Sequence, residues 1–220
     1  DIYVLHQRLK QRYPDVPLCI MGHSMGSFLT RTYLIRYPGT VKAAVIMGTG
    51  WQPRAAITGG LALANAIAAV SGENATSELV TELAFGSYNK LFAPNRTKVD
   101  WLSADESNVD DYIADPLCGA DATVGLFRQM LHGIRFNQRQ SHLRQMDREM
   151  PVLFVAGDKD PVGNCGKGVR QTYDAFRAAG MRDCTLKLYP GLRHEILNEK
   201  AYTADITKNI EAWLLSRLEK

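Results

Sequence analysis

The stretch that decides the fold is Gly22-His23-Ser24-Met25-Gly26, which follows the apolar run Leu18-Cys19-Ile20-Met21 and precedes residues 27–37, a segment with helical character. A Gly-x-Ser-x-Gly between a strand and a helix holds the serine hydroxyl on a tight, strained turn. The flanking glycines let the strand and the helix approach closely, and the Met25 N–H can then point at a developing oxyanion. The alternative, a glycine-rich turn with an incidental serine, is disfavoured by the strand and helix on either side.

Other short apolar runs predict further strands, separated from one another by helical or loop segments. Residues 41–47 and 151–156 are rich in apolar and β-branched side chains, which is typical of strands buried on both faces. A strand, a helix and a second strand in succession predict a right-handed parallel crossover. The sequence therefore predicts an α/β fold with a mostly parallel sheet, with strands at residues 18–21, 41–47, 151–156 and 185–189 and flanking helices at residues 1–13, 27–37 and 199–218 and before Gly180.

Between the second and third predicted strands the strand signals stop. Helical segments are expected there at residues 55–71, 77–85 and 122–146. An insertion of this size between parallel strands is expected to lie over the carboxyl end of the sheet, where open α/β folds bind ligands. We therefore expect a core formed by residues 1–50 and 150–220, and a helical cap formed by residues 51–149.

Serine hydrolysis needs a base to accept the hydroxyl proton and a carboxylate to hold that base in the right tautomer. Both groups should lie on loops at the carboxyl ends of strands. Asp160 follows the third predicted strand and His194 follows the fourth, so the chain order is serine, acid, histidine. This joint placement predicts that Ser24, Asp160 and His194 form a catalytic triad.

Other residues compete for these roles. Asp158 is a second candidate for the acid, although it emerges closer to the strand end and is expected to be a solvated or loop-capping carboxylate. His6 lies on the opening helix, and His132 and His142 lie in the cap, where packing or exposure is the simpler role. His23 is expected to point away from the base position and to pack beneath the serine turn.

Composition narrows the class of protein. With 220 residues, 45% of them hydrophobic and 22% charged, the chain is long and apolar enough for one globular unit. The net charge of +3 and the absence of a basic stripe with interleaved aromatics argue against nucleic acid as a partner. The four cysteines are widely spaced, which indicates neither a disulfide scaffold nor a metal site.

Several motifs together resemble the α/β-hydrolase family that contains the bacterial lysophospholipases and the monoacylglycerol lipases. The resemblance covers essentially the whole chain and is carried by residues 22–26, Gly48-Thr49-Gly50, Asp115-Pro116-Leu117-Cys118, residues 157–162 and Tyr189-Pro190-Gly191-Leu192-Arg193-His194-Glu195. It implies that Ser24 is the nucleophile, Asp160 the acid and His194 the base. It also implies carboxylic-ester substrates with a medium or long acyl chain, and no metal or organic cofactor.

The sequence departs from this family at its start. Members carry several strands before the helix that opens this chain, and a His-Gly-containing loop whose backbone N–H completes the oxyanion hole. We therefore expect these residues to be a carboxyl-terminal portion of a longer protein, with the amino-terminal strands outside it. The strand that carries Ser24 is then expected to expose an edge.

The cap offers candidate substrate contacts. Trp51, Leu61, Leu63 and Ile67 are a candidate wall for an acyl pocket, and the alternative is that they pack the cap on the core. Four arginines fall as two i, i+4 pairs that could meet a phosphate or an anionic membrane, although a solvated helical face is the simpler interpretation: Arg135, Arg139, Arg144 and Arg148.

The leading hypothesis is a serine carboxylic-ester hydrolase that acts through an acyl-enzyme on monoacylglycerol- or lysophospholipid-like esters. Two alternatives are a serine peptidase of the proline-iminopeptidase type and a non-catalytic binding protein with the same fold. The expected partners are a small lipid or ester and, through the cap, the surface of a membrane. The expected location is the cytoplasm, with membrane association through the same cap.

Overall fold

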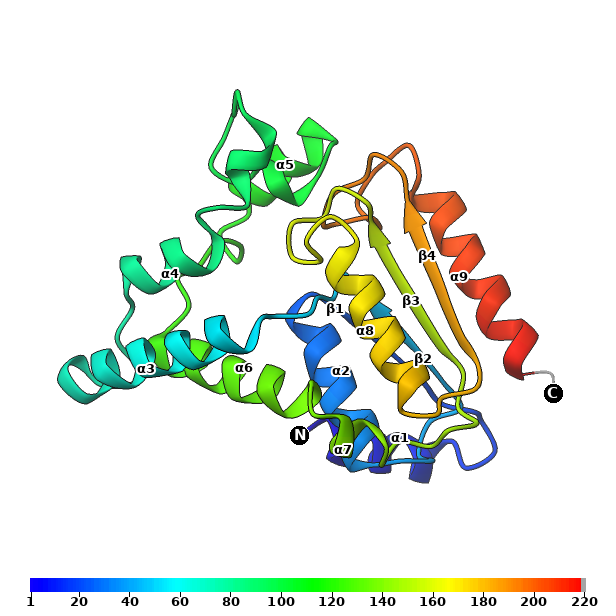
Figure 1. Cartoon of the computed structure of the whole chain (residues 1–220). Helices are drawn as coiled ribbons and strands as arrows, with labels where there is room; N and C mark the ends of the chain where they lie inside the picture. Colours follow the sequence, from blue (N-terminus) through cyan, green and yellow to red (C-terminus); the bar gives the residue numbers. More distant parts are fainter. Residues whose placement is uncertain (219–220) are drawn as a thin grey trace.

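The computed structural model describes residues 1–218, which form a four-stranded sheet with helices on both faces and a further group of helices to one side (Figure 1). The spatial order of the strands is β1 (Cys19–His23), β2 (Ala43–Met47), β3 (Val152–Gly157) and β4 (Cys184–Tyr189). Each neighbouring pair is parallel. The predicted parallel sheet is confirmed, and all four strands lie within about two residues of their expected positions.

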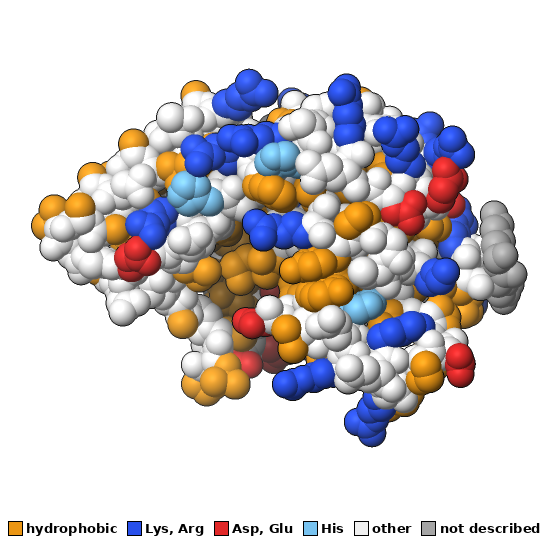
Figure 2. Space-filling model, turned by 90° about the horizontal axis from the view of Figure 1, so that it is seen from below, with side chains coloured by type: hydrophobic (Ala, Val, Ile, Leu, Met, Phe, Trp, Pro, Cys, Tyr) orange, Lys and Arg blue, Asp and Glu red, His pale blue; other side chains and the backbone are white. Residues whose placement is uncertain are grey.

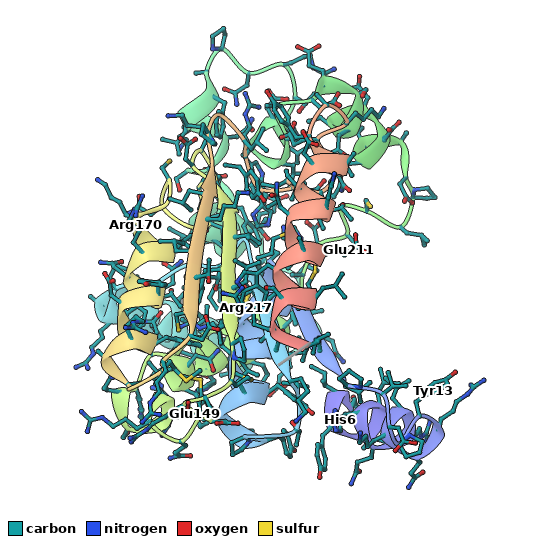
Figure 3. The ribbon with its side chains drawn as sticks, turned by 90° about the vertical axis from the view of Figure 1, so that its right-hand side faces the viewer. His6, Tyr13, Glu149, Arg170, Glu211 and Arg217 are labelled. Carbon is teal, nitrogen blue, oxygen red and sulfur yellow. The ribbon has the colours of Figure 1, made fainter. Side chains whose placement is uncertain are left out.

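Helices cover the two faces of this sheet because successive side chains of a strand point to opposite faces. On one face, Ala44 and Ile46 of β2 belong to the core cluster formed with α2 (Met25–Arg36) and α8 (Lys167–Ala178). On the other face, Val45 and Met47 pack with α9 (Thr203–Leu218). Figure 3 shows α8, which carries the labelled Arg170, and α9, which carries Glu211, on opposite sides of the sheet.

The segment between β2 and β3 holds the helices that lie beside the sheet in Figure 1. Helix α3 (Arg54–Ser71) packs along α6 (Val124–Asn137), and α6 packs on α2, so this group is attached to the core next to the serine turn. The expected helical segment at residues 122–146 breaks at Gln138 and Arg139, and not at Gly125 or Gly133, where the sequence favours a weak point. The helices and 3-10 turns of the segment are α3 (Arg54–Ser71), α4 (Glu78–Phe85), η1 (Asn89–Phe92), η2 (Asp100–Leu102), α5 (Glu106–Ala114), α6 (Val124–Asn137) and α7 (Gln140–Leu143).

Helix α3 is unusually apolar. Among residues 1–218 it is the one helix whose length and composition would allow it to cross a membrane, and few of its residues are buried: Ile57, Leu61 and Ala64. Its contacts with α6 give it one packed side, but α3 is less buried than the core helix of a soluble protein, which can have a similar length and composition. Composition alone therefore does not assign α3 to a membrane.

Strand β1 and helix α1 (Ile2–Arg12) lie on an exposed side of the molecule. Strand β1 ends the sheet, and the Met21 side chain is 47% exposed. No residue of α1 is buried, and Leu5 on its apolar face is 58% exposed. The predicted helix is confirmed, but within residues 1–218 its apolar face is not covered, and Figure 3 shows the part with His6 and Tyr13 standing away from the sheet.

Candidate active site

The turn that carries Ser24 is strained in the way the sequence pattern requires. Ser24 joins β1 to α2 and has φ 55° and ψ −121°, a backbone conformation that residues other than glycine rarely adopt. The turn is held by hydrogen bonds from Ser24 N to Met47 O (3.1 Å) and from Ser27 Oγ to Ser24 O (2.6 Å). Such strain is maintained only where the surroundings fix it, and here the neighbouring strand and the helix do so.

The two glycines of the motif have different surroundings. A Cβ atom on Gly22 would lie 2.2 Å from Gly26 O and 2.3 Å from Thr30 Oγ1, so β1 can meet α2 only without a side chain there. A Cβ atom on Gly26 would have nothing within 4 Å. The expected close approach of strand and helix is therefore made at Gly22, and the lack of a side chain at Gly26 is not needed for it.

Met25 is the first residue of α2. The first N–H groups of an α-helix have no partner within the helix and lie at its positive end. The Met25 N–H, directly after Ser24, therefore lies at this positive end of α2, and its role as a donor to an oxyanion stays a prediction.

The predicted acid and base lie next to each other at the carboxyl ends of β3 and β4. His194 Nδ1 and Asp160 Oδ2 are 3.0 Å apart, and the two residues are 2% and 0% exposed. The second oxygen, Asp160 Oδ1, accepts a hydrogen bond from Val162 N at 2.9 Å. A carboxylate held on both oxygens orients the imidazole and leaves Nε2 available on its far side.

The loops that carry this pair are hydrogen-bonded to each other. Lys159 N donates to Leu192 O at 2.9 Å. Gly157, at the end of β3, allows this contact because a Cβ atom there would lie 2.1 Å from Leu192 O and 2.3 Å from Arg193 O. The spacing between acid and base is thus fixed by backbone contacts as well as by the side chains.

Gly48, directly after β2, links the serine turn to the histidine. Its neighbour Met47 accepts the hydrogen bond from Ser24 N, while a Cβ atom on Gly48 would lie 3.1 Å from Cε1 of His194. The His23 ring lies beside the same glycine, and its Nε2 is 3.0 Å from His194 O. His23 thus packs against His194, with 4.5 Å between the ring centroids, so the expectation that it points away from the base position is wrong. Burial, together with the nearby His194 ring, lowers the pKa of His23.

The competing acid and histidines are engaged elsewhere. Asp158 accepts a hydrogen bond from Gly191 N at 2.8 Å and so caps the turn after β4, as expected. His132 contacts Arg135, and His142 contacts the carbonyl of Phe136. Within residues 1–218, His194 is the histidine that contacts the Asp160 carboxylate.

A cavity of about 550 Å³ opens at Ser24 and Met25 and extends under the helices of the inserted segment, which is the expected cap of residues 51–149. Its walls are almost wholly apolar and come from α3, α4 and α6, with contributions from Tyr88 and Trp101. Figure 2 shows a hollow with mainly hydrophobic walls on the face that it draws. The volume is typical of small-molecule sites, which are lined by apolar side chains with a few polar groups.

The predicted acyl-pocket wall is only partly placed at this cavity. Leu63 lines it, whereas Trp51, Leu61 and Ile67 are not among its lining residues. Leu61 is buried instead in the cluster with Phe28 that joins α3 to α2. Helix α3 thus contributes Leu63 to the cavity wall, whereas helical spacing does not distinguish the cavity side of α3 from its packing side, and a substrate contact stays a prediction.

Two aromatic residues at this site were not predicted. The Trp101 ring lies 5.2 Å from the His194 ring, and Tyr88 packs edge-on against Trp101 at 5.2 Å. Burial, with a smaller contribution from the Asp160 carboxylate, raises the pKa of Tyr88 to about 12. Its phenol therefore stays protonated at neutral pH and can donate a hydrogen bond inside the cavity.

Comparison with known proteins assigns the chain to a family. The family model described as "Serine aminopeptidase, S33" matches residues 1–201. The chain belongs to this family. This membership agrees with the resemblance inferred from the motifs, and the α/β-hydrolase fold is confirmed by the solved structures that share it.

Members of this family and related structures extend over more residues than the present chain. The monoacylglycerol lipase of Mycolicibacterium smegmatis is 31% identical over 94% of this chain and 65% of its own length. The monoglyceride lipase of Mus musculus is 26% identical over 96% of this chain and 62% of its own length. A carboxyl esterase from Bacillus coagulans, solved with glycerol, matches with a TM-score of 0.91 and 24% identity over 98% of this chain and 70% of its own. The chain thus spans about two thirds of the length of these proteins.

Proposed function

We propose that the protein hydrolyses carboxylic esters through an acyl-enzyme on Ser24, and that its substrates are monoacylglycerol- or lysophospholipid-like esters. The observation that carries this proposal is the buried pair of His194 and Asp160, 3.0 Å apart, at the sheet edge where the strained Ser24 opens into an apolar cavity. A nucleophile, a base and an orienting carboxylate near one cavity are the parts that acyl transfer needs.

The chemistry follows from the direction of each hydrogen bond. With Nδ1–H donated to Asp160, Nε2 of His194 can accept the Ser24 hydroxyl proton while Oγ attacks the ester carbonyl carbon. The Met25 N–H donates to the oxyanion of the tetrahedral intermediate. His194 then gives its proton to the leaving alcohol, and a water molecule activated by the same imidazole hydrolyses the acyl-serine.

The apolar cavity supports a lipid-like acyl group. Burying an alkyl chain against apolar walls is favourable by about 0.8 kcal/mol for each CH₂ group, so a long acyl chain gains more from this cavity than acetate does. The names of the lipases and the esterase that the chain resembles point the same way.

The family description favours one other reaction, the hydrolysis of peptides by an aminopeptidase. Such an enzyme must hold a protonated amino terminus, and a buried ammonium group needs a carboxylate partner. The residues among 1–218 that line the cavity include no Asp or Glu. The walls of this cavity therefore support an ester substrate better than a peptide.

The test compares the full-length protein with its Ser24→Ala variant on a medium-chain p-nitrophenyl ester, a monoacylglycerol, a lysophospholipid and an aminoacyl p-nitroanilide. We expect ester hydrolysis by the wild type and its loss in the variant. Retained ester hydrolysis in the variant would remove Ser24 from the mechanism. Hydrolysis of the anilide alone would identify a peptidase, and no turnover of any substrate would identify a binding protein.

We further propose that the cap contacts a membrane surface. Leu79 and Leu83 on α4 are exposed, as is Leu126 on α6, and the last two also line the cavity. An apolar rim at the mouth of a cavity would let a lipid pass from a bilayer without crossing water. Sedimentation with phosphatidylcholine vesicles should carry down the wild type, and less of a Leu79→Ser, Leu83→Ser variant.

A further inference from the structure

The loop that carries His194 is fastened to the inserted helices on both sides of the histidine. Before it, Arg193 Nη1 donates to Asp100 O (2.5 Å) and to Ser103 O (2.9 Å). After it, Glu195 N donates to Leu102 O at 2.8 Å. The two neighbours of His194 are thus bound to one short stretch, residues 100–103, which lies far away in the sequence.

Between these contacts, Trp101 faces the histidine. Its ring is 5.2 Å from that of His194, and it also forms part of the cavity wall. Asp160 holds the imidazole through Nδ1, and Trp101 packs against the same ring. The orientation of the imidazole is therefore bounded by a residue of the core and by a residue of the inserted segment.

A buried carboxylate binds the two residues that follow this stretch. Glu199 is 3% exposed, and its two oxygens accept hydrogen bonds from Ala104 N (2.8 Å) and Asp105 N (3.1 Å). Hydrogen bonds to an ionised acceptor are stronger than those between neutral groups, and loss of this acceptor would leave two N–H groups unsatisfied. Glu199 thus anchors the chain directly after residues 100–103.

The other side of Arg193 is also packed. Its guanidinium group stacks on the Phe92 ring at 4.0 Å from the centroid, and both carbonyls that it binds lie in the inserted segment. Arginine suits this place because a planar guanidinium can stack and donate several hydrogen bonds at once. The contact joins η1 and η2 to the loop after β4.

We infer that Arg193 and Glu199 are positioning residues for His194, because they hold residues 100–103, and with them Trp101, against the imidazole. The inserted segment then sets the orientation of the base as well as the shape of the substrate cavity. This inference rests on the proposed function, since it assigns His194 as the base.

The test uses Glu199→Gln, Glu199→Ala and Arg193→Met in the full-length protein. The amide of Glu199→Gln keeps one acceptor oxygen, so that variant should keep part of the function that Glu199→Ala loses. Arg128→Met is the matched control, because it removes an ion pair of the inserted segment, Arg128 with Glu73, away from the histidine. Far-UV circular dichroism and the melting temperature show which variants fold. If Arg193→Met and Glu199→Ala do not fold, the comparison of Glu199→Gln with the wild type tests the inference.

The kinetic readout separates positioning from substrate binding. For p-nitrophenyl acetate and p-nitrophenyl decanoate alike, kcat should fall by about tenfold to a hundredfold in Arg193→Met and Glu199→Ala, since a displacement of 1 Å in a catalytic group has an effect of this size. KM should change by less than about threefold, and Glu199→Gln should lie between Glu199→Ala and the wild type. The control should match the wild type.

Labelling by a fluorophosphonate probe distinguishes failure of this inference from failure of the proposed function. Ser24 of the wild type should be labelled, and the labelling rate should fall in the variants in parallel with kcat. A labelled wild type with unchanged kcat in the folded variants, or a loss that appears only in KM for the decanoate, would overturn the positioning role alone. A wild type that is not labelled at Ser24 would overturn both.

Discussion

The two sides of the candidate active site are held in different ways. Asp160 and His194 follow the inner strand β3 and the strand β4, are almost fully buried, and are fixed by hydrogen bonds between their own loops and from the inserted segment. Ser24 follows β1, which like β4 lies at an edge of the described sheet, and is fixed mainly by the backbone of its turn. The difference teaches that Asp160 and His194 are held by side-chain and backbone contacts from several segments, whereas Ser24 is held mainly by backbone contacts of its own turn and of β2.

Removing the charge of the acid should have the largest effect on activity. Asp160→Asn keeps the shape of the site. If the amide oxygen accepts the hydrogen bond from Val162 N, the NH₂ group faces His194 Nδ1 and donates to it, which favours the wrong tautomer of His194. The expected loss in kcat is about 10⁴-fold. Asp158→Asn is the control, since Asp158 caps a turn, and it should keep activity within about tenfold. Equal losses in the two variants would show that Asp160 has no special role.

On the serine side, the two motif glycines should respond very differently. Gly22→Ala places a Cβ atom 2.2 Å from a backbone oxygen, so it should destabilise the fold by more than about 3 kcal/mol or prevent folding. Gly26→Ala has open space and a helical position, so its free energy of unfolding should stay within about 1 kcal/mol of the wild type. Urea unfolding measures both, and similar losses would contradict the close approach at Gly22.

Gly48 connects the two sides, and a substitution there should impair activity more than stability. Gly48 has φ +58°, and a Cβ atom would lie 3.0 Å from the His23 ring and 3.1 Å from the His194 ring. Gly48→Ala should lose about 1–2 kcal/mol of stability from the backbone and about tenfold in kcat from displacement of the imidazole.

The matched control for this position is Gly39→Ala. Gly39 has φ +74° with nothing near its Cβ position, so the control carries a similar backbone strain without crowding a histidine. It should lose similar stability and keep full kcat per folded molecule. An equal loss of kcat in both variants would refute the contact between residue 48 and the imidazole.

The smallest expected effect is the dependence of stability on the protonation of His23. Because burial lowers its pKa, the folded state binds fewer protons at this ring than the unfolded state does, so stability is highest above the unfolded value near 6.5 and is lost as the pH falls below it. His23→Gln should show a smaller difference between the free energies of unfolding at pH 7.5 and pH 5.5. An unchanged difference would mean that His23 does not contribute to the acid sensitivity.

Most of the sheet could be predicted because each inner strand is a short, continuous apolar run with a turn on either side. The runs at residues 41–47 and 151–156 correspond to β2 and β3, whose residues are all buried. The break between α6 and α7 could not be predicted, since the glycines within α6 are tolerated and the chain turns at Gln138. The exposure of the apolar face of α1 could not be predicted either, because helical spacing shows that a face is apolar but not what covers it.

The three triad residues could be proposed from their places after strands, since the carboxyl ends of parallel strands share one edge. The rest of the site could not. Trp101 reaches His194, and Tyr88 packs against Trp101, because the inserted segment folds back on the loop after β4, and no local pattern predicts that contact. The same long-range contact brings Arg193 and Glu199 to residues 100–105.

The central claim is that Ser24 forms a covalent acyl intermediate. The most direct measurement is rapid acid quench of the full-length protein during turnover of p-nitrophenyl decanoate, followed by mass spectrometry of its peptides. We predict that the peptide containing Ser24 gains the mass of one decanoyl group, and that the Ser24→Ala protein shows no such adduct. Steady turnover with an unmodified Ser24 peptide, or with the acyl group on another residue, would contradict the account.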